Sequence, residues 1–185
     1  MYEWLFMQGK VSAMVEGRTI KRVLAAFGNA GVVRAKDFAA KGIHRKRLTD
    51  MVNVGLIDHV GHGLYRRHAH QPTQHHALVQ ASVAVPGGNI CLLSALWFHG
   101  MTTLLPRQVW LALNSRSWKP TIKQPNIRFI RMAGHMHIED LSPHTIEGVN
   151  IYVYSPARTV VDCFRYRKVV GIDIAMDAMQ AFFRR

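Results

Sequence analysis

The sequence is poor in cysteine, in acidic residues and in long apolar runs. Its 185 residues include two cysteines, Cys91 and Cys163, both within apolar helical patterns, which predicts buried reduced thiols and no disulfide framework. No run of about 18 apolar residues occurs, so a membrane-spanning helix is excluded. The first residues lack a basic stretch followed by an apolar core and a cleavage site, so we expect a cytoplasmic and not a secreted protein.

The motifs of common enzymes are missing as well. The sequence contains no glycine-rich phosphate loop, dinucleotide fingerprint, metalloprotease helix or zinc-binding cysteine pair. The histidines of segment 67–76, and the pair His135 and His137, have no cysteine or carboxylate partners in zinc-site spacing, so we interpret them as solvated. Ser94 and His99 would point to different faces of one helix. The acidic residues of the second half form no spaced carboxylate pair typical of a metal-dependent nuclease. We therefore predict no enzyme activity, no metal and no cofactor.

The most informative excess is positive charge. Lysine and arginine number 24 against 11 acidic residues, which gives a net charge of +13 and a pI near 10.5. Twelve basic residues stand against five acidic ones up to His70, and twelve against six after it, so both halves are basic. Such a charge favours a polyanionic partner, of which nucleic acid is the usual one. The alternative is a basic surface that serves solubility.

The segment Gly31–Arg67 has the order of a winged helix-turn-helix. It predicts a first helix over Ala35–Lys41, a left-handed Gly42 at its end, and a second helix over His44–Val54 that Gly55 ends. Glycines of the turn Gly61-His62-Gly63 supply the backbone geometry of a tight hairpin. The two strands predicted around this turn are Leu56–Val60 and Leu64–Arg67.

The second of these helices is expected to enter the major groove of DNA. Leu48, Met51 and Val52 recur at helical spacing and predict its buried stripe. The opposite face then presents the candidates for base contacts, which are Arg45, Lys46, Thr49 and Asn53. Arg and Lys donate to guanine, Asn pairs with adenine, and a Thr methyl contacts thymine. A solvated helix face is the alternative, and Asp50 counts against groove contact because a carboxylate near phosphates must pair or contact cytosine.

Phosphate contacts are expected from the first helix and from the wing, at Lys36, Lys41, Arg66 and Arg67. For His62, at the wing tip, two roles stay open: entry into the minor groove, or simple filling of the turn. The complete set of predicted DNA-binding residues is Lys36, Lys41, His44, Arg45, Lys46, Arg47, Thr49, Asn53, His62, Arg66 and Arg67.

The predicted fold class is α+β, with an N-terminal winged helix-turn-helix domain followed by a small mixed α/β domain. The first domain covers residues 1–67 and includes a supporting helix over Thr19–Phe27. Residues 1–16 form only a loose amphipathic pattern, which fits either packing on this domain or an extension from an upstream start codon. The polar segment 68–76 is the expected linker, and residues 77–185 form the second domain.

The second domain is expected to combine helices and strands. The predicted helices are Ala77–Val85, Cys91–His99, Ala157–Lys168 and Ile172–Phe183. The predicted strands are Gln108–Leu113, Ile127–Met132 and Ile146–Tyr154, the last with Gly148 at a turn. The basic loop Arg116–Lys123 contains Trp118, which either stacks on a base or lies at an ordinary surface.

The last two helices carry the clearest local signals of this domain. Ser155-Pro156 is typical of a helix start, and Arg158 and Asp162 are spaced to pair along one helix. Helical spacing predicts that Val160, Val161 and Phe164 face inward. For the final helix it predicts an inward face of Ile172, Ala175, Met176, Met179 and Phe183.

Three stretches of the sequence resemble the AbiEi family of antitoxins. "RLTDMVNVGLIDHVGHGLYR" is similar to the winged N-terminal domain of that family, and "CLLSALWFHGM" and "SPARTVVDCFRYRKVVGIDIAMDAM" resemble its C-terminal domain. The resemblance implies a DNA-binding autorepressor that binds inverted repeats in its own promoter and counters a co-transcribed nucleotidyltransferase-type toxin. It places the antitoxin activity mainly in the C-terminal half. Members are type IV antitoxins, so a stable complex with the toxin is not required.

Two alternatives to an antitoxin follow from the same residues. One is a stand-alone winged-helix regulator without a toxin partner, which only the neighbouring gene distinguishes from the antitoxin. The other is a basic nuclease-like enzyme with a winged targeting domain. The latter needs a clustered set of metal-binding carboxylates in the second half, which the sequence lacks.

Overall fold

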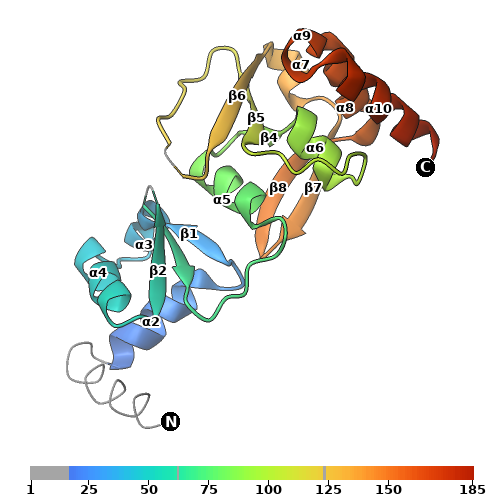
Figure 1. The fold of residues 1–185 in the computed structure, drawn as a ribbon. Coiled ribbons are helices and arrows are strands. Elements are labelled where there is room, and N and C mark those ends of the chain that lie inside the picture. Colours follow the sequence, from blue (N-terminus) through green and yellow to red (C-terminus); the bar gives the residue numbers. More distant parts are fainter. Residues whose placement is uncertain (1–16, 62, 123) are drawn as a thin grey trace. The chain divides into compact units, whose positions relative to one another are not determined.

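A computed structural model describes residues 17–61, 63–122 and 124–185 of the chain (Figure 1). These residues form two compact units. One reaches to Thr73 and includes Glu147–Val149, and the other comprises Gln74–Ile146 and Asn150–Arg185. Each unit contains helices and a β-sheet, which confirms the predicted α+β class. No helix of these described ranges is long and apolar enough to cross a membrane.

The first unit has the element order of a winged helix. Its elements are α2 (Gly17–Phe27), β1 (Val32–Arg34), α3 (Ala35–Ala40), α4 (Arg45–Asn53), β2 (Ile57–Gly61) and β3 (Leu64–Arg67). Strand β3 lies between β1 and β2 and runs antiparallel to both. Helices α3 and α4 therefore form the helix pair, and β2–β3 forms the wing.

Local signals in the sequence explain where these helices end. Gly42 has a φ of 69° and Gly55 a φ of 71°, the left-handed conformation that a glycine adopts without strain and that ends a helix. Both observations match the prediction. The predicted boundaries of α3 and α4 differ from the observed ones by one residue, since Lys41, His44 and Val54 are cap positions.

The core of the first unit lies between the helices and the sheet. Leu48 and Met51 of α4 are fully buried, as their spacing predicts, while Val52 is half-buried. Phe38 of α3 is fully buried between two other rings, with centroid distances of 5.0 Å to Phe27 and 6.1 Å to Tyr65. Edge-to-face contacts of this kind stabilise a core beyond the burial of the rings themselves.

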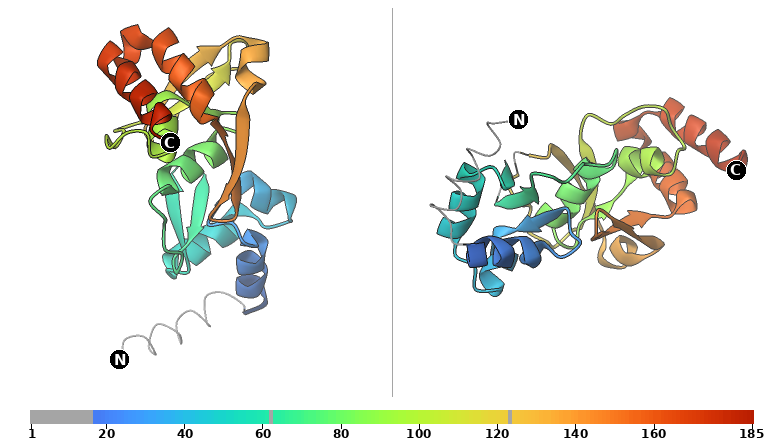
Figure 2. Two further views of the ribbon diagram at one scale, coloured as in Figure 1. Left: turned by 90° about the vertical axis from the view of Figure 1, so that its right-hand side faces the viewer. Right: turned by 90° about the horizontal axis from the view of Figure 1, so that it is seen from below.

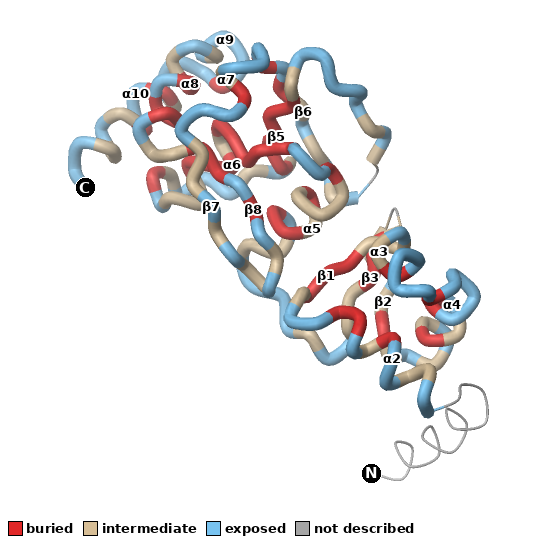
Figure 3. The backbone as a smooth tube through the Cα atoms, turned by 180° about the vertical axis from the view of Figure 1, so that it is seen from behind, coloured by how far each residue is buried: buried red, intermediate tan, exposed pale blue. Residues whose placement is uncertain are grey.

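The second unit is built on a five-stranded mixed sheet. Its elements are α5 (His76–Ala84), β4 (Asn89–Ile90), α6 (Leu92–Phe98), β5 (Val109–Asn114), β6 (Ile127–Met132), α7 (Gly134–Ile138), β7 (Leu141–Ile146), β8 (Val149–Tyr154), α8 (Pro156–Arg165), α9 (Arg167–Val170) and α10 (Ile172–Phe183). The strand order is β6-β5-β4-β8-β7. Strand β4 is antiparallel to β5 and parallel to β8, and β5 is parallel to β6. In Figure 3, buried residues follow one another along β5, and others lie in α6.

Helices α8 and α10 lie side by side in the second unit (Figures 1 and 2). Buried positions of this pair include Cys163 on α8 and Ala175 and Ala178 on α10. Alanine at a helix contact lets the two backbones approach closely, so α10 turns its small residues inward.

The structure corrects several predictions for the second unit. The expected helix Ala157–Lys168 is divided at Tyr166 into α8 and α9, and β4, α7 and β7 were not predicted. The expected strand Ile146–Tyr154 contains the last residue of β7 and all of β8. The predicted turn at Gly148 is confirmed, since Glu147 and Gly148 join the two strands with φ values of 51° and 69°, those of a tight hairpin turn.

The predicted inward faces of the last helices are wrong in part. Val160 is buried, but Val161 is 63% exposed. On α10 the exposed side chains are Ile172, Met176 and Phe183, whereas Ala175 is buried as predicted and Met179 is half-buried. The helix is apolar on two faces, and periodicity alone does not show which face is inside.

Candidate nucleic-acid interface

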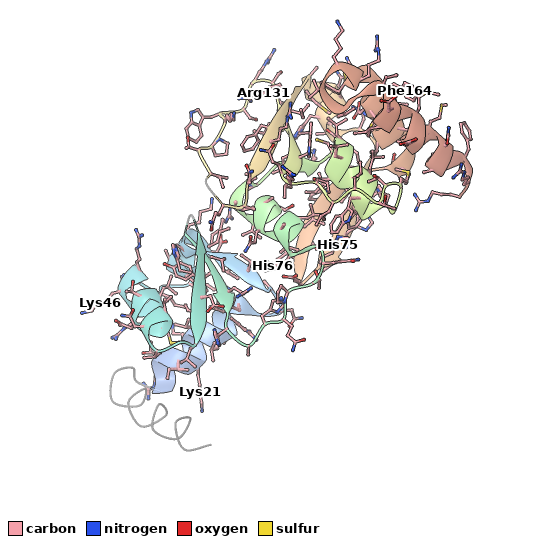
Figure 4. All side chains as sticks on the ribbon, in the orientation of Figure 1. Lys21, Lys46, His75, His76, Arg131 and Phe164 are labelled. Atoms are coloured by element: carbon pink, nitrogen blue, oxygen red, sulfur yellow. The ribbon has the colours of Figure 1, made fainter. Side chains whose placement is uncertain are left out.

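Helix α4 presents a polar, largely basic face to solvent. Arg45, Lys46, Thr49 and Asn53 are all exposed, and Lys46 extends away from the helix in Figure 4. In the described part of the chain, no hydrogen bond or ion pair engages the side chains of Arg45, Lys46 or Asn53. The Thr49 hydroxyl donates to the Arg45 carbonyl at 3.3 Å, one turn back along the helix.

Asp50, the residue that counted against groove contact, lies beside a cation. Its carboxylate is 3.9 Å from the Arg47 guanidinium, one turn away on the same helix. Arg47 remains half-exposed. An exposed pair at this distance is weak, but it places a positive charge next to the one acid of the helix.

The turn before α4 is held from outside by α2. The Arg22 guanidinium donates to the carbonyls of Lys41 at 3.0 Å and Gly42 at 3.3 Å. A Cβ at Gly42 would lie 2.9 Å from that guanidinium, so a side chain there meets both strain and crowding. No local sequence pattern indicates this role of Arg22, because its partners are backbone carbonyls that are about 20 residues distant in the sequence.

Two predicted phosphate contacts, Lys41 and Arg67, are bound to the end of α2. Lys41 Nζ donates to the Ala26 carbonyl at 2.6 Å. Arg67 donates to the carbonyls of Leu24 and Gly28, both at 2.8 Å, and its guanidinium lies 5.4 Å from the centre of the Phe27 ring. The last carbonyls of a helix lack intrahelical partners, and cations satisfy them well. These contacts give Lys41 and Arg67 a role in holding the fold.

A third predicted phosphate contact, Arg66, belongs to a pair across the wing. It lies opposite Asp58 in the β2–β3 register and donates to that carboxylate at 2.8 Å. His68 Nδ1 lies 2.9 Å from the other oxygen of the same carboxylate. Burial alone would raise the pKa of Asp58, but the hydrogen bonds from His68 and Arg66 outweigh it and lower this pKa.

The remaining predicted residues of the first unit are Lys36, His44 and His62. Lys36 is exposed on α3, and His44 is exposed at the position before α4. Next to Lys36, Arg34 and Asp37 form two hydrogen bonds of 3.0 Å, and the bond from Arg34 lowers the pKa of Asp37. His62 lies outside the described residues, as does the segment 1–16.

Several cations of strand β6 and of the basic loop in the second unit contact aromatic rings or backbone carbonyls. The Arg128 guanidinium lies 4.4 Å from the centre of the Trp110 ring, and Lys119 Nζ lies 5.5 Å from that of Phe129. Arg131 donates to the carbonyls of Asn114 and Ser117, so it closes the base of the loop. Trp118 is 79% exposed, which keeps both predicted roles of this loop open.

Polar groups inside the second unit form a buried network. Ser155 Oγ accepts from the Arg158 backbone nitrogen at 3.3 Å, and Arg158 Nε donates to Asp162 at 2.9 Å, so the predicted cap and pair are confirmed. Arg158 also donates to the Met136 carbonyl at 3.0 Å. Burial raises the pKa of Asp162, although Arg158 lowers it in part.

The two cysteines and His137 are interior groups. Cys91 and Cys163 are free and fully buried as predicted, and burial raises the pKa of Cys163 to about 12. Such thiols are inert as nucleophiles. His137, expected to be solvated, is instead buried on α7, where its Nε2 lies 3.2 Å from the Ala112 carbonyl and its own carbonyl accepts from Asn89 at 2.7 Å. Within the described residues, no group of three or more His, Cys, Asp or Glu side chains is arranged to hold a metal ion.

The fold and the exposed basic face of α4 together define the first unit as a winged helix-turn-helix module. A family model described as "Transcriptional regulator, AbiEi antitoxin" matches residues 21–68. This match runs from within α2 to the end of β3. It confirms, for that segment, the resemblance to AbiEi antitoxins, a family of transcriptional regulators. For the second unit the resemblance stays a prediction. No curated protein matches the chain.

Proposed function

We propose that the protein binds double-stranded DNA in a sequence-specific manner, with α4 in the major groove. The observation that carries this proposal is the face of Arg45, Lys46, Thr49 and Asn53, which is exposed and whose two cations have no partner among the described residues. Cations that the fold does not use are available for a ligand. A major groove admits one helix, and these side-chain types match base edges.

Of the predicted phosphate contacts, Lys36 fits the proposal best. It is exposed on the helix that precedes α4. Lys41, Arg66 and Arg67 each already bond to the first unit itself, so in this proposal they support the fold and contribute less to DNA binding. His44 is the residue before α4, and we expect it to contact the backbone of DNA beside the groove.

The biological role we propose is an antitoxin that represses its own promoter at inverted repeats and counters a co-transcribed nucleotidyltransferase-type toxin in the cytoplasm. The family match supports the regulatory part of this role. The antitoxin part rests on the resemblance of the second unit. A stable complex with the toxin is not part of the proposal.

Footprinting on the protein's own upstream region tests the DNA-binding proposal. We expect protection of an inverted repeat by the full chain, and loss of that protection in the variant Arg45→Ala/Lys46→Ala. The matched control is Arg107→Ala/Lys168→Ala, which removes two exposed cations of the second unit outside its basic loop. Equal protection by the wild type and the α4 variant at moderate salt would reject α4 as the helix that contacts bases.

The salt dependence of binding tests which cations meet phosphates. Neutralisation of two phosphates by Lys36 and Arg47 predicts a log-log slope of about −2. Participation of Lys41, Arg66 and Arg67 as well would steepen the slope to about −4.5. A flat response would reject DNA as the partner.

Growth under co-expression tests the antitoxin role. If the neighbouring reading frame encodes a nucleotidyltransferase, its expression alone should stop growth and co-expression of this chain should restore it. Regulation of the promoter without any such toxic neighbour would instead favour the stand-alone regulator.

A further inference from the structure

Helix α10 has an apolar stripe on the face that is turned away from its own unit. Ile172, Met176 and Phe183 are 48%, 40% and 78% exposed, and Met179 is half-buried beside them. The four residues alternate in steps of four, three and four along the chain, which is the spacing of a and d positions in a heptad. The adjacent face holds the buried residues Ala175 and Ala178, and Met179, at the edge between the two faces, also packs against the core of the unit.

A helix that is apolar on two faces normally has two neighbours. Helix α8 is the neighbour of the inner face. No element of the described ranges covers the outer stripe, since its side chains remain exposed with all described residues in place. Heptad spacing indicates that the missing neighbour is another helix.

Charges on one flank of the stripe indicate which helix this is. Asp173, Asp177 and Arg184 are exposed, and a step of about 100° per residue places them on the same side of α10, within roughly 40° of one another. The flank is acidic at its beginning and basic at its end. In an antiparallel pair related by a two-fold axis, each flank faces the same flank of the other helix in reverse order, so acidic and basic ends meet.

We propose that α10 pairs antiparallel with α10 of a second copy of this chain. In this pair Ile172 lies opposite Phe183, Met176 lies opposite Met179, and Asp173 faces Arg184 of the second copy. Both the stripe and the flank are complementary to themselves, which is the requirement for a two-fold interface. A parallel pair would instead bring the acidic ends together. The proposal is independent of DNA binding.

The pair is small, so the dimer forms reversibly. A helix of 12 residues is about 18 Å long, well below the extent of a permanent dimer interface. The Asp–Arg contacts are exposed and determine direction more than affinity. The full chain should therefore change from monomer to dimer as its concentration rises.

Sedimentation velocity of the full chain without DNA, over a range of concentrations, tests the dimer. Phe183→Asp and, separately, Met176→Asp should each raise the dissociation constant of the dimer by about ten-fold or more, because each places a charge between the two paired α10 helices. Trp118→Ala is the control, since it removes another exposed aromatic and should leave the constant unchanged. Circular dichroism confirms that each variant is folded. The proposal would be overturned if the chain stayed monomeric at every concentration, or if the two Asp variants dimerised like the wild type.

Charge exchange and crosslinking test the direction of the pair. Asp173→Arg and Arg184→Asp should each weaken the dimer, and the two changes together should restore it. Cys91 and Cys163 are buried, so one cysteine introduced on α10 is the accessible thiol. In the antiparallel pair the two copies of residue 176 lie roughly 5 Å apart along the helix and those of residue 172 roughly 16 Å apart. A short bismaleimide should therefore link Met176→Cys but not Ile172→Cys, and the reverse result would overturn the antiparallel arrangement.

Discussion

The two units of this protein have nearly equal net charge and use it differently. In the first unit, Arg45 and Lys46 stand exposed on one helix without partners among the described residues. In the second, Arg158 is buried against a carboxylate, and Arg128 covers a tryptophan ring. A charged side chain without a partner in its unit is available to a ligand, whereas one that is paired within the unit stabilises that unit. The comparison teaches that a total charge predicts the kind of partner and says little about where it binds.

Arg158→Met should give the largest effect on the stability of the second unit. The change leaves the carboxylate of Asp162 buried without its partner, and removal of one member of a buried pair costs about 3–5 kcal/mol. Chemical denaturation measures this loss. The double variant Arg158→Met/Asp162→Leu removes both charges and should recover much of the stability. A single variant as stable as the double one would show that this arginine, like those of α4, is not used by the fold.

Arg45→Ala should show the opposite behaviour. If α4 contacts bases as proposed, specific DNA binding should weaken by about 1–3 kcal/mol, because one bidentate base contact would be lost. The free energy of unfolding should stay within about 0.5 kcal/mol of the wild type, since the side chain is exposed. Fluorescence anisotropy and denaturation on the same preparation measure both quantities. A destabilised Arg45→Ala would contradict the distinction between the two kinds of cation.

Arg67→Met tests the same distinction within the first unit. The variant leaves the carbonyls of Leu24 and Gly28 without their donor, so we expect a loss of about 1–2 kcal/mol in stability. Affinity for DNA per folded molecule should change less than in Arg45→Ala. If Arg67→Met weakened DNA binding by more than it lowered the free energy of unfolding, Arg67 would have to be a DNA contact.

The smallest expected effect is a dependence of the second unit on pH. Burial lowers the pKa of both His75 and His99; for His99, Arg185 and His144 lower it further, while a hydrogen bond to the Tyr154 carbonyl opposes them. A histidine with a lowered pKa in the folded state binds protons more readily when unfolded. Its contribution is therefore complete above the unfolded pKa of about 6.5 and is lost as the pH falls through that value towards the folded pKa.

Thermal unfolding at pH 8 and pH 5.5 measures this dependence. We expect a lower midpoint at pH 5.5, and a smaller difference in His99→Gln, which does not titrate. In the first unit, Asp37 and Asp58 have lowered carboxyl pKa values, so both groups titrate below this pH range. An equal fall of the unfolding midpoint in both units between pH 8 and pH 5.5 would contradict the expected difference between them.

Local signals explain why the first unit could be predicted well from the sequence. Gly42 and Gly55 mark helix ends through their own backbone conformation, and Leu48 and Met51 form a single apolar stripe. Each of these signals acts within one or two helical turns. The roles of Lys41 and Arg67 depend instead on carbonyls 15 to 43 residues away, a proximity that only the folded chain creates.

The second unit was harder to predict for a related reason. Helix α10 has a broad apolar surface. Ala175 and Ala178 are buried, and Ile174 and Phe182 also pack against the core, so periodicity alone does not show which apolar residues face inward. Strand β4 has only two residues, Asn89–Ile90, and exists because β5 and β8 pair with it on either side. Pairing partners of this kind are not encoded in the periodicity of the strand itself.

The two hydrogen bonds from Arg22 have a consequence for genetics. They fix the turn between α3 and α4 from a helix that presents no predicted base contact. A screen for loss of repression should therefore recover changes at residue 22 alongside those on α4. Compensating changes in the operator would distinguish the two kinds of variant. A changed operator can compensate for an altered side chain on α4, whereas no operator sequence restores a turn that has lost its support.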